Sequence, residues 1–123
     1  MIRALIVDDE KMTRNGLVRH IKWEQLGVDE VQTAASSNEA LQMLDTLHPD
    51  LVISDIRMPL MRGDEFLRYM KANELFKSIP IVMLSSEEST TERIKLLEEG
   101  AEDYILKPFN PLELKIRIKK IID

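Results

Sequence analysis

Short apolar runs alternate with longer amphipathic stretches along the whole chain. Five runs have the length and the branched, apolar composition of strands: Arg3–Val7, Val31–Ala35, Leu51–Ser54, Pro80–Leu84 and Asp103–Leu106. The runs around Ile6, Ile53 and Val82 are apolar on both faces, which is typical of a central parallel sheet with helices on two sides. These three runs are therefore expected to lie in the interior of one sheet.

The stretches between the runs carry helix start signals. Ser36 with Glu39, and Ser89 with Glu92, have the spacing of capping boxes. The pair Asn110–Pro111 places an N-cap residue before a proline at the first helical position. Five repeats of strand then helix predict an α/β fold with a doubly wound, five-stranded parallel sheet.

Length and composition narrow the class of protein. The 123 residues, of which 44% are apolar and 32% charged, are expected to form one domain over residues 1–123. The net charge of -5 argues against broad, nonspecific binding of nucleic acid by this domain. No apolar run reaches the length of a membrane span, and no signal peptide is recognised. We expect a cytoplasmic protein that does not bind membranes.

The sequence contains no cysteine. Disulfides, thiolate metal sites and a cysteine nucleophile are therefore excluded. The two histidines, His20 and His48, are isolated in the sequence and make a zinc site improbable.

Polar side chains follow the predicted strands. In open parallel sheets the ligand site lies beyond the carboxyl ends of the strands. The residues at or just after those ends are Asp8, Asp9, Asp55, Ser85, Ser86 and Lys107. Any one of them alone would be an ordinary loop residue or helix cap, but the opposite strand ends carry no comparable cluster. We therefore expect these side chains to meet at one edge of the sheet.

Three close carboxylates raise one another's pKa and need a cation. Oxygen ligands without histidine or cysteine favour Mg²⁺, with Mn²⁺ as the alternative. Mg²⁺ usually keeps several waters, which leaves room for phosphate oxygens. An aspartate can attack phosphorus to give an aspartyl phosphate. A metal and a lysine would neutralise charge on the transferring group, and a serine hydroxyl would hydrogen-bond it.

The segments "VDDE", "SDIRMP", "IVMLSS" and "GAEDYILKPF" occur in this order and span essentially the whole chain. With them the sequence strongly resembles the receiver domain of two-component response regulators. The resemblance implies a flavodoxin-like, CheY-like sheet in the order 2-1-3-4-5 with five helices. It also implies a sensor histidine kinase as phosphoryl donor. The domain would promote phosphorylation and dephosphorylation of itself, and would not be an enzyme with a turnover substrate.

The resemblance also implies roles for the acids. Asp55 matches the phospho-acceptor. Asp9 matches the direct Mg²⁺ ligand, and Asp8 matches the acid that holds the metal largely through water. The backbone carbonyl of Arg57 matches a further protein ligand, so that the implied metal site comprises Asp8, Asp9, Asp55 and Arg57.

Four further positions match phosphoryl-binding and switch residues. Ser85, with Ser86 beside it, matches the hydroxyl that turns toward the phosphoryl group. Lys107 matches the ammonium that pairs with that group, and it precedes a proline that is cis in this family. Tyr104 matches the switch aromatic whose burial follows phosphorylation, although an aromatic near a strand end can equally be plain packing.

The sequence departs from the commonest family pattern at Arg62, where Asp often precedes the glycine at position 63. Positions 57 and 87 flank the path of the hydrolytic water in this family. We hypothesise that Arg57 and Glu87 approach each other across the site mouth and tune the lifetime of the phosphoryl group. The alternative is that both are solvated side chains, since exposed ion pairs contribute little.

The last predicted helix is apolar on two sides. One face carries Leu114, Ile118, Ile121 and Ile122. Leu112 and Ile116 lie on the opposite side, where they suggest a second contact. In the family this region, formed by the fourth helix, fifth strand and fifth helix, is the signalling and dimer face. We hypothesise that Leu112 and Ile116 join a homodimer interface when Asp55 is phosphorylated; the alternative is that neighbouring side chains partly cover them.

The segment "HIKWEQLGVDEV" is similar to the same connection in receivers joined to AraC-type DNA-binding output domains. It suggests a piece of a longer transcription regulator, with DNA bound by an output domain outside this sequence. A stand-alone receiver that acts by protein binding or in a phosphorelay is the alternative.

Two other classes share part of the pattern. A haloacid-dehalogenase-like phosphatase also uses an aspartate and Mg²⁺, but it normally needs a D-x-D pair, whereas the acids here are adjacent. The fourth-strand acids of that class are also absent here, and the sequence is too short to contain a cap domain. A pseudo-receiver that only binds partners is disfavoured because all five key positions are intact.

Overall fold

The computed structural model describes residues 1–123. Its elements are β1 (Arg3–Val7), α1 (Lys11–His20), the 3-10 helix η1 (Trp23–Leu26), β2 (Glu30–Ala34), α2 (Ser37–Leu47), β3 (Leu51–Asp55), α3 (Gly63–Ala72), β4 (Ile81–Ser85), α4 (Thr90–Glu98), β5 (Asp103–Leu106) and α5 (Pro111–Ile122). The strands are parallel and lie in the order β2-β1-β3-β4-β5. The predicted fold class and strand order are confirmed. None of the helices has both the length and the apolar character needed to cross a membrane.

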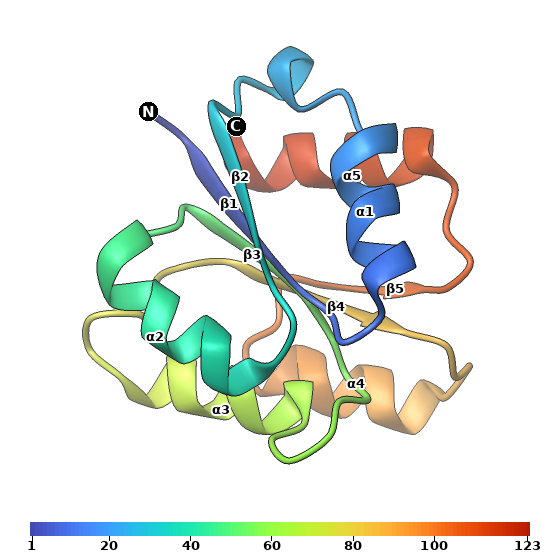
Figure 1. Ribbon diagram of the computed structural model, residues 1–123. Coiled ribbons are helices and arrows are strands. Elements are labelled where there is room, and N and C mark those ends of the chain that lie inside the picture. The colour runs from blue at the N-terminus through green and yellow to red at the C-terminus, as the bar shows by residue number, and fades with distance from the viewer.

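Helices cover both faces of the sheet. Figure 1 shows α1 and α5 on one face and α2, α3 and α4 on the other. Each face has its own apolar core. Phe66 and Leu96 belong to the cluster under α2, α3 and α4, and Leu17 and Ile118 belong to the cluster under α1 and α5. This double cover explains why the sequence around β3 and β4 does not alternate: every residue of both strands is buried.

Three of the five strands, β2, β3 and β4, differ from the predicted bounds by one residue, and two of these differences affect the site. β3 runs through Asp55 and β4 runs through Ser85, so both polar residues belong to the strands themselves. β4 begins after Pro80, which has no N–H to donate to the ladder, although its carbonyl accepts from the Val52 N–H at 2.9 Å. Asp55 and Ser85 are therefore held by the hydrogen bonds of the sheet and do not belong to the loops that follow it.

Three helices begin as their caps predict. The Ser36 hydroxyl accepts the Glu39 N–H at 3.1 Å, and the Ser89 hydroxyl accepts the Glu92 N–H at 3.1 Å. Asn110 caps α5 by accepting the N–H of the residue two positions on. The side-chain oxygens satisfy backbone donors that a helix start leaves free.

In a capping box the glutamate side chain also accepts the backbone N–H of the cap residue. This second hydrogen bond is absent from both predicted boxes, so that part of the prediction is wrong. The Glu39 carboxylate accepts from the Ala35 N–H at 3.3 Å, which is one residue before the cap. The Glu92 carboxylate accepts from the Tyr104 hydroxyl at 3.0 Å. A tertiary partner from β5 thus takes the place of the local backbone donor.

The long connection after α1 is anchored in the core. Trp23 is buried, and its indole N–H donates to the Leu17 carbonyl of α1 at 3.1 Å. Gly27 ends η1 in the left-handed region, with φ of 77°. The indole therefore ties η1 to α1 in the same apolar core that contains α5.

The two apolar sides of α5 differ in burial, as predicted. Leu114 and Ile118 are fully buried, whereas Leu112 is 69% and Ile116 is 58% exposed. Neighbouring side chains cover Leu112 and Ile116 only in part, which is compatible with either interpretation of these two residues. Their part in a homodimer stays a prediction.

Candidate functional site

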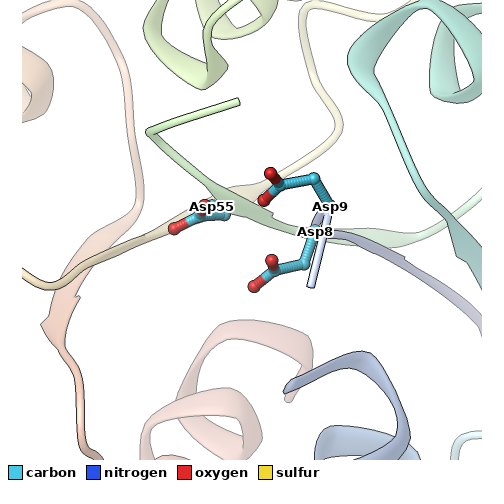
Figure 2. Close-up of side chains that lie close together, drawn as sticks. All are labelled: Asp8, Asp9 and Asp55. Carbon is cyan, nitrogen blue, oxygen red and sulfur yellow. The ribbon is translucent and has the colours of Figure 1, made fainter. Parts of the chain in front are cut away.

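Three carboxylates meet at the carboxyl ends of β1 and β3. These strands are neighbours, with Val7 paired to Ser54, so the residues that follow them lie side by side. One carboxylate oxygen each from Asp8, Asp9 and Asp55 lies within 4.8 Å of the others, and Figure 2 shows the three side chains together. Asp8 is wholly buried and Asp55 is 6% exposed, whereas Asp9 is exposed. The cluster thus consists of two buried carboxylates, Asp8 and Asp55, and one carboxylate that faces solvent, Asp9.

Lys107 supplies the positive charge of the site. Its ammonium lies 2.9 Å from Asp8 Oδ2 and 3.1 Å from Asp55 Oδ1. It is also 3.9 Å from Glu10 Oε1, whose side chain is largely exposed. The Lys107 N–H donates to the Ser85 carbonyl at 2.7 Å, which fixes the backbone from which the side chain extends. The peptide bond between Lys107 and Pro108 is cis, as the family resemblance implies.

Burial and charge shift the pKa values of this cluster. Burial, followed by the nearby Asp8 carboxylate, raises the pKa of Asp55, although Lys107 opposes the shift. Burial lowers the pKa of Lys107, but its hydrogen bond and attraction to Asp8, together with Asp55, outweigh burial and raise it. When all groups are ionised, three carboxylates and one ammonium leave two excess negative charges. A divalent cation would neutralise this excess.

Backbone contacts hold the turn after β1. The Asp8 N–H donates to the Ala34 carbonyl at 3.1 Å. One Asp8 carboxylate oxygen accepts the Glu10 N–H at 2.9 Å, and the Asp8 carbonyl accepts from the Arg14 guanidinium at 2.7 Å. Asp8 is therefore oriented from both its main chain and its side chain, which leaves the second carboxylate oxygen to Lys107.

Gly63 is a positioning residue that sequence reasoning missed. A Cβ on Gly63 would lie 2.0 Å from the Asp55 carbonyl oxygen and 2.9 Å from the Ile56 Cα. The Gly63 N–H donates to the Ile56 carbonyl at 2.8 Å. The start of α3 therefore presses against the backbone that carries Asp55, and only glycine fits. The glycine that follows the Met-Pro turn is the sequence signal for this close approach.

Ser85 is buried and faces its own loop. Its hydroxyl accepts the Glu87 N–H at 3.0 Å and donates to the Glu87 carbonyl at 3.3 Å. Ser86 is exposed. The structure thus brings Ser85 to the site edge at the end of β4 but does not turn its hydroxyl toward Asp55.

Tyr104 lies inward beneath the β4–α4 loop. It is 6% exposed, and its hydroxyl is 3.0 Å from both the Glu87 carbonyl and the Glu92 carboxylate. Burial, with a smaller contribution from Glu92, raises the pKa of the phenol, although the Ser85 hydroxyl opposes the shift. The ring is packed in the core and its polar end is bonded, so packing and a switch role are compatible here.

Arg57 and Glu87 form an ion pair at the site mouth. Their side chains are 61% and 45% exposed, so the pair spans the gap between the β3–α3 and β4–α4 loops in contact with solvent. The predicted approach of the two side chains is therefore present. Its effect on phosphoryl lifetime, and the role of the Arg57 carbonyl as a metal ligand, stay predictions.

This fold and site define a small α/β protein with an acidic, lysine-bearing edge suited to metal-assisted phosphoryl chemistry. Residues 4–119 match the response regulator receiver domain, and the chain belongs to that family. It is a receiver domain of two-component response regulators, a class of domain that interacts with histidine kinases. The haloacid-dehalogenase-like alternative is therefore wrong.

Known proteins of the same family are similar over nearly the whole chain. The phosphate regulon transcriptional regulatory protein PhoB of Escherichia coli is 36% identical, over 98% of this chain and 51% of PhoB. Chemotaxis protein CheY4 of Vibrio cholerae is 33% identical with a TM-score of 0.87, over 98% of both chains. A two component transcriptional regulator AraC from Clostridium phytofermentans is 30% identical with a TM-score of 0.85, over 99% of this chain and 92% of the solved one. The chain spans about half the length of PhoB.

Proposed function

We propose that residues 1–123 form one receiver domain that accepts a phosphoryl group on Asp55 from the phosphohistidine of a sensor histidine kinase. The observation that carries this proposal is the position of Asp55, at a strand end, 3.1 Å from the Lys107 ammonium and beside two further acids. A carboxylate oxygen of Asp55 attacks phosphorus while the phosphorus–nitrogen bond of the donor breaks. The electron pair of that bond returns to the imidazole.

The donor set fits a hard divalent cation. Asp8, Asp9 and Asp55 offer oxygens within 4.8 Å of one another, and the backbone carbonyl of Arg57 is the proposed further ligand. Bound Mg²⁺, or Mn²⁺ in its place, would neutralise charge on the phosphoryl oxygens. The Lys107 ammonium lies between Asp8 and Asp55 and reduces the repulsion between their carboxylates. We expect the same ammonium to pair with the transferred phosphoryl group.

Ser85 completes the proposed response. Its hydroxyl now bonds to the backbone of Glu87, and it would turn to the phosphoryl group on Asp55. Tyr104 is the proposed switch aromatic: its side chain is already inward, and phosphorylation would favour this position further. The chain later promotes hydrolysis of its own acyl phosphate, so it is proposed as a switch without a turnover substrate.

Intact-mass measurement tests this function. With acetyl phosphate and Mg²⁺, the wild type is expected to gain one phosphoryl group, and Asp55→Asn is expected to gain none. Omission of Mg²⁺ is the control for the metal requirement. Folded wild type that gains nothing would leave a pseudo-receiver, and repeated turnover of a generic phosphomonoester would favour a phosphatase activity.

We further propose that Arg57 and Glu87 tune the lifetime of the acyl phosphate. Their exposed ion pair joins the loops that follow β3 and β4, and we expect it to restrict the access of water to the phosphoryl group. Arg57→Ala and Glu87→Ala are each expected to change the dephosphorylation rate severalfold. Arg19→Ala, at an exposed arginine of α1, is the control. Unchanged rates in both variants would contradict the idea.

The homodimer proposal rests on Leu112 and Ile116, which are the large exposed apolar residues of α5. Sedimentation is expected to show a monomer without a phosphoryl mimic and a dimer with beryllofluoride and Mg²⁺. The substitution Leu112→Ser should keep the domain monomeric in both states. A wild type that stays monomeric with the mimic bound would overturn the proposal for this chain.

The output is proposed to be control of transcription in the cytoplasm, through a DNA-binding module outside this sequence. Similarity to PhoB and to the regulator named AraC supports this proposal. A receiver that acts alone, by partner binding or phosphorelay, is the competing proposal. The length of the native gene product distinguishes them: an open reading frame of about the present length would contradict the transcription regulator.

A further inference from the structure

Glu92 of α4 does not make the reciprocal capping-box hydrogen bond that the sequence predicts. Ser89 caps the Glu92 N–H at 3.1 Å, but the Glu92 carboxylate does not return to the start of the helix. Its Oε1 atom instead lies 3.0 Å from the Tyr104 hydroxyl. The Glu92 side chain is only 26% exposed. The carboxylate therefore serves a tertiary contact between α4 and β5.

Tyr104 has one hydroxyl proton and two acceptors within reach. The Glu87 carbonyl and Glu92 Oε1 are both 3.0 Å from its oxygen, and neither the carbonyl nor an ionised carboxylate can donate. The Ser85 hydroxyl can supply the second proton, since it donates to the same Glu87 carbonyl at 3.3 Å. Two protons then satisfy two acceptors, with Ser85 on the carbonyl and Tyr104 on Glu92.

This proton count links the serine to the tyrosine. When the Ser85 hydroxyl turns to a phosphoryl group on Asp55, the Glu87 carbonyl loses a donor. Tyr104 lies 3.0 Å from that carbonyl and from Glu92 Oε1, so its one proton can then be shared between the two acceptors while the contact with Glu92 is kept. Glu92 therefore keeps Tyr104 at the position where its proton is needed after phosphorylation.

Arg62 orients the same carboxylate from the start of α3. Its guanidinium lies 4.0 Å from Glu92 Oε2 and 3.0 Å from the Asp64 carboxylate. The positive charge attracts one oxygen of Glu92, which leaves the other facing Tyr104. An aspartate at position 62, the residue that the family resemblance leads us to expect, would repel Glu92 instead.

We propose that Glu92, oriented by Arg62, is a positioning residue that holds Tyr104 inward and raises the population of the conformation that receives the phosphoryl group. This inference rests on the proposed function of Asp55. A side-chain contact that exists in only one conformation shifts the equilibrium toward it by its own free energy. Loss of that contact should weaken the binding of every ligand that prefers the conformation with Tyr104 inward.

Beryllofluoride with Mg²⁺ is the probe, and ¹⁹F NMR titration measures its affinity. Glu92→Ala is expected to weaken binding about tenfold, the scale of one charge-assisted hydrogen bond. Glu92→Gln keeps an acceptor oxygen and is expected to stay within about threefold of wild type. Glu98→Ala, at an exposed glutamate of the same helix, is the matched control and should bind as wild type does. Urea unfolding of both Glu92 variants checks that each is folded, so that weaker binding by Glu92→Ala alone reports positioning and not loss of the fold.

A double-mutant cycle with Tyr104→Phe makes the test specific. If Glu92 acts through the tyrosine hydroxyl, Glu92→Ala should weaken binding little further in the Tyr104→Phe background. Additive losses, or a Glu92→Ala affinity equal to that of Glu98→Ala, would overturn the inference. A wild type that binds no beryllofluoride and gains no phosphoryl group would instead overturn the proposed function of Asp55.

Discussion

Asp55 is a residue at which function and stability oppose each other. Burial and the neighbouring Asp8 raise its pKa, so its ionised form is disfavoured in the native state. Asp55→Asn should therefore increase the free energy of unfolding at neutral pH by about 1–2 kcal/mol. Urea unfolding without divalent cations measures the difference.

The sign of the pH dependence follows from the same shift. The pKa of Asp55 in the native state lies above the unfolded value of 3.8. Between these two pKa values the native state therefore binds the proton more tightly than the unfolded state does. The deficit of wild type relative to Asp55→Asn should shrink as pH falls through the native pKa and vanish below 3.8. A difference that stays constant from neutral to acidic pH would show that charge at Asp55 is not its cause.

Gly63 gives a second test at the scale of one residue. Gly63→Ala places a Cβ 2.0 Å from the Asp55 carbonyl, against backbone that cannot move aside cheaply. We expect a loss of about 3 kcal/mol of stability and slower phosphorylation. Gly16 lies in the middle of α1, and a Cβ there would be 3.8 Å from its nearest neighbour, the His20 ring. Gly16→Ala should therefore raise the free energy of unfolding by about 0.5–1 kcal/mol. Equal effects of the two substitutions would contradict the assigned close approach.

At the scale of elements, α5 separates core from surface. Leu114→Ala should cost about 2–5 kcal/mol because the side chain is fully buried. Leu112→Ala should change the free energy of unfolding by less than about 0.5 kcal/mol. Denaturant unfolding of the monomer distinguishes the two. A large loss for Leu112→Ala would mean that this side chain belongs to the core.

The sequence was sufficient to predict the strands, their order through the family resemblance, and the helix N-caps, because these depend on local pattern and on backbone donors nearby. The contacts of Glu92 and Gly63 were not predictable in the same way. Tyr104 reaches Glu92 only after β5 and α4 pack together, and the contact of Gly63 with Asp55 depends on the path of the β3–α3 loop. Such contacts arise from tertiary structure, which local pattern does not specify.

At the scale of the whole molecule, the acidic edge links metal binding to stability. A ligand that binds only the native state stabilises it by mass action, about 2.7 kcal/mol at a hundredfold excess over Kd. Mg²⁺ should therefore raise the thermal midpoint of wild type in a concentration-dependent way. Asp9→Asn should largely abolish this rise, while Asp45→Asn, at an exposed acid of α2, should preserve it. Equal responses of the two variants would contradict the assigned metal site.

The central claim is that Asp55, and neither of the two acids beside it, carries the phosphoryl group. Borohydride reduces an aspartyl phosphate to homoserine, so reductive trapping followed by peptide mapping locates the modified residue. After treatment with acetyl phosphate and Mg²⁺, we expect homoserine at position 55 and unmodified aspartate at positions 8 and 9. Homoserine at Asp8 or Asp9, or none at position 55 in folded protein that has gained a phosphoryl group, would contradict the account.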